Sequence, residues 1–303
     1  MSFLDTFFEM LVILFGIAAG YLAHRLGYLG GEIDQKISKI ILNITMPCLI
    51  LGSVISGSDL PDTAIILSLL WTSAIFYGIQ IVVAMAAAPL LGGTPAQRGV
   101  WRYGLVFSNS AFIGYPVTVA LFGSDALFYA VILVLPANIM SYTLGVLMLK
   151  GARRFRRKQL VSPCVIAAVL ALFLVLTRIH LPSLTGELLN FVGDVTVPLS
   201  LLVVGSLLAG LPMKRIFASP RLWILTVLRL LVLPAILWAV LSWLGVDALV
   251  RGVAITLMAM PIAINGTMLS MEYGGDTECM AQATFLTTLV SIITIPVVAV
   301  LFL

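Results

Sequence analysis

The chain carries two short polar stretches inside long apolar segments: SNSAFIGYP at residues 108–116 and MPIAINGT at residues 260–267. Each stretch combines Pro, Gly and Asn. Proline removes a backbone donor and clashes with the preceding turn, glycine lowers the cost of non-helical dihedral angles, and an asparagine amide can replace lost backbone partners. We therefore predict that both segments are helices broken at these stretches. Unwound backbone at membrane depth requires protein or a water-lined cavity around it.

The two stretches occupy corresponding places in an internal repeat. The tripeptide Arg-Gly-Val occurs at residues 98–100 and again at 251–253, a separation of 153 positions. The sequence FGSD at 122–125 is echoed by YGGD at 273–276, a separation of 151. Both separations are close to half of the 303 residues. The chain is therefore predicted to contain two copies of one unit.

Composition indicates a membrane protein. Hydrophobic residues make up 61% of the chain, charged residues 10%, and the mean hydropathy is +1.15, whereas a soluble domain carries about 25% charged residues. The first ten residues contain no Lys or Arg, which argues against a cleavable signal peptide. The three cysteines lie in apolar segments and are expected to be buried and structural.

A membrane-spanning helix needs roughly 20 apolar residues, and polar punctuation divides the sequence into ten such candidates. They run over 5–24, 34–56, 63–90, 98–122, 125–149, 160–179, 187–209, 217–244, 248–271 and 277–302. Five spans per copy is an odd number, so the copies are expected to be inverted, as in many secondary transporters. The predicted division is a first repeat at 1–149, a basic cytoplasmic linker at 150–159 and a second repeat at 160–303.

The basic residues orient this arrangement. With the N-terminus outside, fourteen of them fall on the inner side: Arg25, Lys36, Lys39, Arg98, Arg102, Lys150, Arg153, Arg154, Arg156, Arg157, Lys158, Lys214, Arg215 and Arg221. The outer side receives Arg178 and Arg251, and Arg229 lies within a span. This asymmetry follows the positive-inside rule. It predicts a multi-pass protein of the cell (inner) membrane with both termini outside, in the periplasm. The linker serves as a topology anchor, or alternatively as a patch for anionic lipids.

The predicted breaks fall near the middle of the membrane. Asn109 lies 11 residues after Arg98, and Asn265 lies 14 after Arg251. At 1.5 Å per residue these offsets are about 16 and 21 Å into a core about 30 Å thick. Two antiparallel broken helices would cross there, and their half-helix N-termini would offer N–H groups and partial positive charge to an anion. Ordinary proline kinks are the simpler alternative.

A second matched pair is Asn43-x-x-x-Pro47 and Asp194-x-x-x-Pro198, 151 positions apart. A carboxylate at membrane depth costs about 2.5–3.5 kcal/mol on the insertion scale. Asp194 is therefore a candidate for binding a coupling proton or Na⁺, unless it is shallow and hydrated from the outer side. Arg229, near the middle of its span, is expected to pair with a carboxylate, attract an anionic substrate or snorkel.

Several motifs resemble the auxin efflux carrier family. Asn109-x-x-x-x-Gly114-x-Pro116 is similar to that family's crossing segment in span four, and Ala259-Met260-Pro261 followed by Glu272-Tyr273 to its segment in span nine. Residues 38–47 resemble its second span. The resemblance implies a fold like that of sodium–bile acid symporters and sodium–proton antiporters, an elevator movement, organic monoanion or dicarboxylate substrates, and a homodimer. The chain lacks the long central loop of plant members and resembles short prokaryotic ones.

These observations predict a secondary transporter of a small organic anion, either auxin-like or a dicarboxylate such as malonate, in contact with membrane lipids and not with nucleic acid. The expected substrate-binding residues are Asn109, Ser110, Gly114, Tyr115, Pro116, Pro261, Asn265, Gly266 and Thr267. The expected coupling or support residues are Asn43, Pro47, Asp194 and Pro198. No cofactor or metal is expected. Transport is either coupled to H⁺ or Na⁺ or is a uniport driven by the membrane potential.

Other functions fit the sequence less well. The two histidines, His24 and His180, lie at span ends without a zinc-protease pattern, which disfavours an intramembrane enzyme. A cation-coupled antiporter would need acidic residues at the crossing, where Asn109 and Asn265 are neutral. A channel or sensor on the same fold is the remaining alternative.

Overall fold

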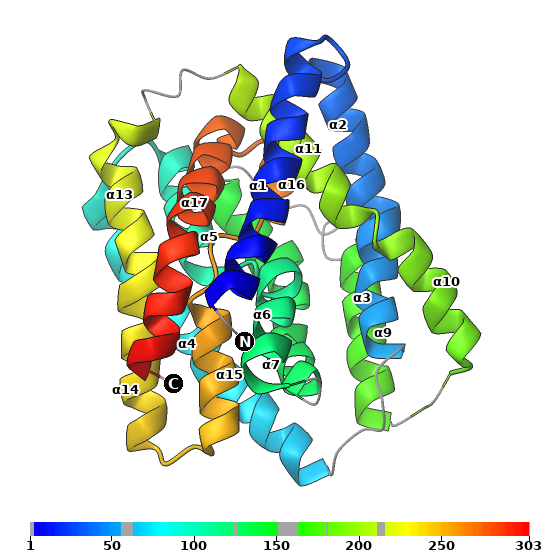
Figure 1. Ribbon diagram of the computed structural model, residues 1–303, viewed down its shortest axis with the longest axis vertical. Coiled ribbons are helices and arrows are strands. Elements are labelled where there is room, and N and C mark those ends of the chain that lie inside the picture. The colour runs from blue at the N-terminus through cyan, green and yellow to red at the C-terminus, as the bar shows by residue number, and fades with distance from the viewer. Residues whose placement is uncertain are drawn as a thin grey trace.

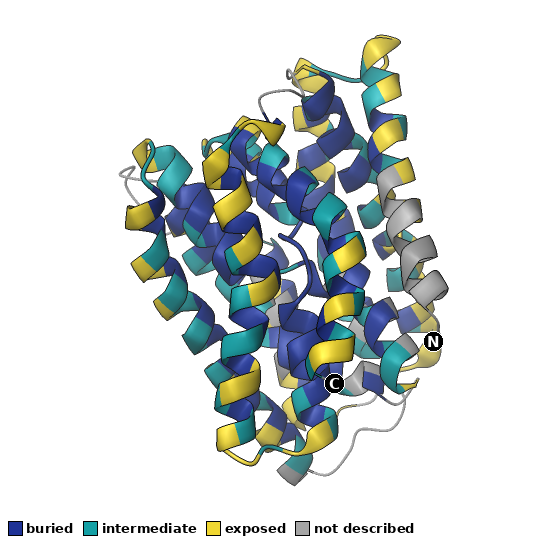
Figure 2. Cartoon of the chain, turned by 60° about the vertical axis from the view of Figure 1, so that its left-hand side comes forward, coloured by how far each residue is buried: buried dark blue, intermediate teal, exposed yellow. Residues whose placement is uncertain are grey.

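The computed structural model describes residues 3–55, 63–123, 126–150, 163–177, 179, 181–210 and 216–302. Within these ranges every regular element is a helix, and one isolated β-bridge joins two loops (Figure 1). Buried residues fill the interior of the bundle, and exposed residues follow the outward faces and the two ends (Figure 2). All of the expected basic linker except Lys150 lies outside the described residues, as do Arg178, His180, Lys214 and Arg215.

Packing contacts divide the helices into two groups. The first helix group contains α1 (Phe3–Arg25), α2 (Gly31–Ile40), η1 (Ile41–Thr45), α3 (Met46–Ile55), α9 (Pro163–Thr177), α10 (Ser183–Gly193) and α11 (Thr196–Ala209). In it α1 packs on α11, and α3 packs between α9 and α10. In Figure 1, α3, α9 and α10 lie on the right side of the molecule.

The second helix group is larger and holds both broken segments. It contains α4 (Thr63–Leu91), α5 (Pro95–Val106), η2 (Ser110–Gly114), α6 (Tyr115–Phe122), α7 (Ala126–Met140), η3 (Ser141–Gly145), α8 (Val146–Leu149), α13 (Pro220–Val227), η5 (Leu228–Val232), α14 (Leu233–Trp243), α15 (Ala248–Met258), α16 (Asn265–Tyr273) and α17 (Thr277–Phe302). Here α4 packs on α5 and α7, and α17 packs on α13 and α16. The groups meet where α9 contacts α7, and where α1 and α11 contact α17.

The helices follow the predicted spans closely. Each predicted span corresponds to helical residues whose outer bounds differ by at most four positions, the largest shift being the start of α10. Among the described residues, five stretches are long and apolar enough to cross a membrane: Ile65–Leu91, Tyr129–Leu149, Ser183–Ala209, Pro220–Trp243 and Thr277–Phe302. The breaks divide two other predicted spans into shorter helices. The structure thus supports a multi-pass membrane protein.

Three prolines are accommodated by π-helical turns. The turns η1, η2 and η5 are each centred four residues before a proline, namely Pro47, Pro116 and Pro234. An α-helical proline would clash with the carbonyl four residues earlier and leave it without a donor. A π turn inserts extra backbone at that point and moves the carbonyl away. The helix therefore continues through these prolines instead of ending.

Small residues let α1 and α11 approach closely. A Cβ atom on Gly16 would lie 2.8 Å from Leu201 Cδ1, one on Gly20 would overlap the Leu202 carbonyl, and one on Gly205 would overlap the Ile17 carbonyl. Gly16-x-x-x-Gly20 is the small-x-x-x-small spacing that brings helix backbones together in membranes. This contact is the most extensive between any two helices of the first helix group.

We expect Gly205→Ala to destabilise the protein, because the added methyl group forces α1 and α11 apart. Overpacking of this kind costs about 1–3 kcal/mol, which a lowered melting temperature of the purified protein in detergent would report. Gly78→Ala in α4 is the matched control. A Cβ at Gly78 meets no atom within 4 Å, and alanine is the better helix former, so its melting temperature should hold or rise. Equal melting of both variants would contradict the packing of α1 on α11.

Candidate crossing site

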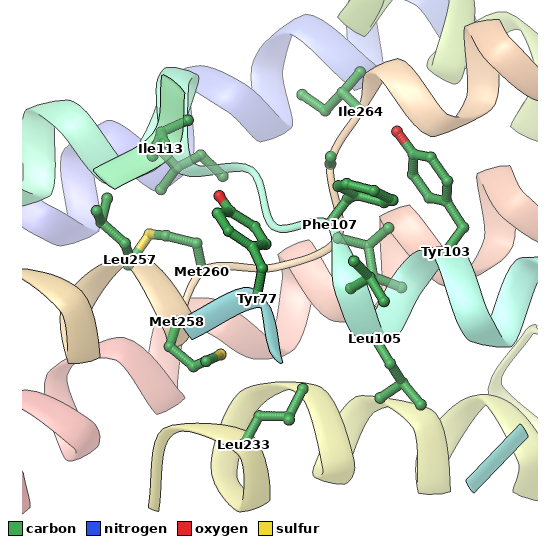
Figure 3. Close-up of a cluster of buried hydrophobic side chains, with 14 of the residues drawn as sticks. Tyr77, Tyr103, Leu105, Phe107, Ile113, Leu233, Leu257, Met258, Met260 and Ile264 are labelled. Carbon is green, nitrogen blue, oxygen red and sulfur yellow. The ribbon is translucent and has the colours of Figure 1, made fainter. Parts of the chain in front are cut away.

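The two predicted breaks lie side by side in the interior. The first unwound stretch is 107–109, between α5 and η2, and the second is 259–264, between α15 and α16. Ser108 and Ile262 form an isolated antiparallel bridge between them. Figure 3 shows the two stretches passing each other, with Phe107 on one, Met260 and Ile264 on the other, and Tyr103 beside them.

Backbone hydrogen bonds join the two stretches directly. Asn109 N donates to the Pro261 carbonyl at 2.7 Å, and Ala263 N donates to the Phe107 carbonyl at 3.0 Å. Backbone groups that lose helical partners in an apolar interior must find others. Each unwound stretch supplies the partners that the other has lost, so the crossing is a structural unit and not two independent kinks.

The first break ends earlier than predicted. Gly114, Tyr115 and Pro116 lie beyond it in the continuous helical run of η2 and α6. In η2 the Gly114 N donates to the Asn109 carbonyl at 3.2 Å, a bond across five residues that is typical of a π turn. The expectation that Pro116 breaks the helix is therefore wrong, because the π turn absorbs the proline.

The glycines at the crossing permit close packing. A Cβ on Gly114 would lie 2.8 Å from Leu257 Cδ2, and one on Gly266 would lie 2.5 Å from Tyr103 Cε1. Both glycines were expected to contribute to substrate binding, for which a glycine has only its backbone groups, but Gly114 N is bonded as described above and Gly266 N donates to the Ala263 carbonyl at 3.1 Å. Both expectations are corrected: these residues bring helices together and do not offer free donors.

A cavity of about 50 Å³ lies against the crossing. This volume exceeds the roughly 10–15 Å³ that a single water requires. Its lining residues are Met46, Phe107, Ser108, Asn109, Ser110, Val134, Ala137, Ser141, Ala263, Ile264 and Asn265. No charged side chain is among them. The cavity thus joins apolar walls to a few hydroxyl and amide groups, as small-molecule sites do, and its volume is below the roughly 300–1,000 Å³ of typical ligand pockets.

Asn109 presents an unpaired donor in this cavity. Its side chain is 2% exposed, and its Nδ2 has no hydrogen-bond partner in the described structure. Buried polar atoms nearly always have a partner, and an exception calls for a specific explanation such as a bound molecule. An acceptor in the cavity would satisfy this amide.

Asn265 faces the same cavity from α16 with its amide oriented. Its Oδ1 accepts a hydrogen bond from the Tyr103 hydroxyl at 3.1 Å, and that hydroxyl lies 2.9 Å from Ser141 Oγ. Because Tyr103 uses its proton on Asn265, Ser141 donates to Tyr103. The oxygen of the Asn265 amide is thereby occupied, and its Nδ2 group, which has the Tyr142 hydroxyl as a neighbour, is the donor that remains.

The remaining predicted site residues surround the cavity in different ways. Ser110 lines it and lies 2.6 Å from Ser108, hydroxyl to hydroxyl. Pro261 contributes its carbonyl to the crossing. Thr267 is fully buried and Tyr115 half-buried, and neither lines the cavity. Of the nine predicted residues, the structure therefore brings Asn109, Ser110 and Asn265 to the cavity wall.

Arg229 lies on another side of the crossing, fully buried within η5. Its Nε donates to the Met260 carbonyl at 3.1 Å and its Nη2 to the Met258 carbonyl at 3.0 Å. Its Nη1 donates to the Leu105 carbonyl and to Gln80 Oε1, both at 2.8 Å. The expectations of an ion pair, of snorkelling and of a place in the substrate site are corrected: Arg229 binds the carbonyl ends of both broken helices.

The C-terminal and N-terminal helix ends at the crossing have different surroundings. The C-terminal ends of α5 and α15 carry partial negative charge, and Arg229 holds carbonyls from both. The N-terminal ends of η2 and α16 carry partial positive charge. Both ends lie at the cavity, because Asn109 and Ser110 at the start of η2 and Asn265 at the start of α16 line it. Among the described residues that line the cavity there is no Asp or Glu. The positive ends of two helices therefore face the cavity, and such ends are suited to an anion.

The second matched pair lies elsewhere. Asn43 and Asp194 are exposed and belong to the first helix group. Asn43 Nδ2 donates to the Lys39 carbonyl at 2.8 Å. Pro47 and Pro198 each lack the N–H that would bond the carbonyl four residues earlier, and the helix is distorted at Asn43 and Asp194 accordingly. The structure does not bring these residues to the crossing.

Sequence reasoning missed Tyr103, Ser141 and Gln80. Tyr103 and Ser141 occur in apolar spans where a single polar group carries little information. Gln80 offered a clearer signal, because it is the one long amide in helix α4, whose other polar side chains are hydroxyls. A buried amide of that kind requires a partner, which is Arg229.

Comparison with known proteins gives relatives over nearly the whole chain. An uncharacterized transporter of Methanothermobacter thermautotrophicus is 26% identical over 98% of this chain and 98% of its own length. An uncharacterized transporter of Methanocaldococcus jannaschii is 24% identical over 94% and 95%. A protein of Rhizobium meliloti named "Putative malonate transporter" is 22% identical over 92% and 90%.

These relatives are transporters and not enzymes, and they are prokaryotic, as the resemblance to short auxin efflux carriers implied. The family model described as "Membrane transport protein" matches residues 5–155 and 152–299. The chain therefore belongs to this family of membrane transport proteins, to which the auxin efflux carriers also belong.

Proposed function

We propose that the protein is a secondary transporter of a small organic carboxylate, which binds in the cavity at the crossing. One observation carries this proposal: two amide donors, one of them buried and unpaired, meet two helix N-termini in a cavity without a carboxylate. Oriented N–H groups and helix N-termini are the elements that bind anions in proteins.

The charge at the crossing favours one carboxylate group. A helix N-terminus is equivalent to roughly +0.5 elementary charge, so two of them supply about one positive charge. The cavity lining that the structure describes contains no Lys or Arg to balance a second negative charge. The Met46, Val134 and Ile264 side chains offer apolar contacts for the rest of the molecule. A monocarboxylate with a small apolar body matches this wall better than a dianion does.

We further propose that the helices cross the membrane ten times as two inverted repeats and that the second helix group moves as an elevator. Both broken segments, Arg229 and nearly all of the cavity wall belong to that group, whereas Met46 belongs to the first helix group. A movement of one group against the other would change what covers the cavity without separating the crossing strands. Alternating access in related architectures uses such rigid-body movements.

A cation-coupled antiporter is less consistent with the site. Ionisable residues within the membrane mark proton and ion pathways, and none is found among the described residues of the cavity wall. The Rhizobium meliloti relative named as a malonate transporter supports an organic acid as substrate class. Dicarboxylates enter this scheme most readily as their singly charged forms.

We expect Asn109→Ala to weaken carboxylate binding about 10- to 100-fold, because hydrogen bonds to a charged group are worth about 1.5–3 kcal/mol. The unliganded variant should melt at the wild-type temperature or above it, since the substitution removes a buried donor that has no partner. Binding is measured by the thermal shift that a monocarboxylate such as butyrate produces, and transport by uptake into proteoliposomes.

Asn43→Ala provides the matched control for this experiment. Asn43 is also an asparagine of a predicted span, but it is exposed and lies in the first helix group. Its variant should bind and transport as the wild type does. If uptake survived substitution of Asn109 and Asn265 together, the crossing would not be the binding site.

Butyrate should bind more tightly than malonate at neutral pH, where malonate is a dianion. As the pH falls, malonate gains a proton and becomes a monoanion, so its affinity should rise while that of butyrate stays level until butyrate itself is protonated. Titrations of the thermal shift at several pH values would measure both trends. Tighter binding of malonate at neutral than at acidic pH would contradict the charge argument.

The exposed position of Asp194 leads to a prediction about coupling. Because Asp194 lies outside the crossing, Asp194→Asn should leave the pH and Na⁺ dependence of uptake unchanged. Proteoliposomes with imposed gradients of either ion would provide the measurement. If uptake by the variant no longer depended on pH or on Na⁺, Asp194 would be the coupling residue after all.

A further inference from the structure

The surroundings of Arg229 form a cage of neutral oxygens. Its guanidinium donates to Gln80 Oε1 and to the carbonyls of Leu105, Met258 and Met260 at 2.8–3.1 Å. The side chain is 0% exposed. Within the described part of the chain no Asp or Glu forms an ion pair with it, and the ion pair found there is Lys36–Glu32 at the surface. A buried charge without a carboxylate partner has to be stabilised by these oxygens alone.

Helix dipoles supply the balancing charge. The carbonyl of Leu105 lies in the last turn of α5, and the carbonyls of Met258 and Met260 lie at the end of α15 and just beyond it. Each helix C-terminus is equivalent to roughly −0.5 elementary charge, so the two ends together offer about one negative charge. One guanidinium matches that total, which explains how the charge is tolerated without an acidic residue.

Carbonyl and amide oxygens are also the type of ligand that monovalent metal cations bind. Half-helix C-terminal ends and unwound carbonyls at the crossing of broken helices are where secondary transporters hold monovalent cations, and rings of carbonyl oxygens replace the hydration shell of K⁺ in channels. In this chain a side chain from η5 already fills the position. A second cation beside the guanidinium would meet direct repulsion at a few ångströms.

We propose that Arg229 is a resident cation that occupies a monovalent metal-cation site, so that the protein binds its substrate without taking up Na⁺ at the crossing. Removal of the guanidinium opens the cage of Gln80, Leu105, Met258 and Met260 to Na⁺ or K⁺. The proposal concerns the C-terminal side of the crossing and does not depend on which anion binds at the N-terminal side.

The test is the melting temperature of purified Arg229→Met in NaCl, KCl and choline chloride at equal ionic strength, without any carboxylate. Methionine keeps most of the aliphatic stem and removes the charged group. The variant should melt several degrees below the wild type in choline chloride. A metal cation that enters the cage should raise the melting temperature of the variant again, and this rise should saturate with the concentration of the cation. The wild type should melt at one temperature in all three salts.

Arg221→Met is the matched control, because Arg221 is exposed in the first turn of α13. Its melting temperature should not differ among the salts. An Arg229→Met protein that is equally unstable in NaCl, KCl and choline chloride would overturn the proposal and leave Arg229 as a purely structural group.

A second measurement holds even if Arg229→Met fails to fold. The wild type should bind butyrate with the same affinity, within about twofold, when NaCl is replaced by choline chloride. A tenfold loss of affinity in choline chloride would overturn the proposal. If butyrate produced no thermal shift in either salt, the result would count against the carboxylate site instead. Malonate, titrated in the pH range where it is a monoanion, would then be the probe for the comparison of NaCl with choline chloride.

Discussion

Backbone hydrogen bonding in an apolar interior is the constraint on which this structure depends. A buried N–H or C=O without a partner costs about 1–3 kcal/mol, and two broken helices expose several of them. The protein meets this constraint by crossing the two breaks, so that Asn109 bonds Pro261 and Ala263 bonds Phe107. Thr287 of α17 adds a further acceptor for Ile262 N at 3.2 Å. All of these partners belong to the second helix group, which makes the crossing rigid within it.

The crossing also separates charge. Four helix ends meet in one place, and unrelieved repulsion between like ends would oppose the arrangement. Arg229 binds carbonyls from both C-terminal sides, whereas no side chain of opposite charge lies among the cavity residues at the N-terminal sides. The interior therefore carries its own cation on one side and a positive potential facing a cavity on the other. This asymmetry is the feature of the fold on which the proposed binding of an anion rests.

The sequence predicted the helices and the existence of the breaks because these depend on residue types. Apolar length sets the spans, and Pro with Gly and Asn marks a weakened helix. It did not predict that Pro116 would be absorbed, because a π turn leaves no signature in composition. The role of Arg229 was hidden for a related reason: three of its four acceptors are backbone carbonyls, which any residue would provide. Only Gln80 could have pointed to it.

The boundary between the two helix groups bears on how the site would open. Met46 reaches the cavity from the first helix group, while the other lining residues travel together in the second. Across the same boundary Ser38 makes contacts of 3.1 and 3.3 Å with the sulfur atoms of Met268 and Met271, and thioethers are weak acceptors. Sliding one group along the other would exchange soft apolar and O–H···S contacts, and it would leave intact the strong bonds of Arg229 and of the paired strands. The elevator movement that we propose would therefore carry the cavity past Met46 as a whole.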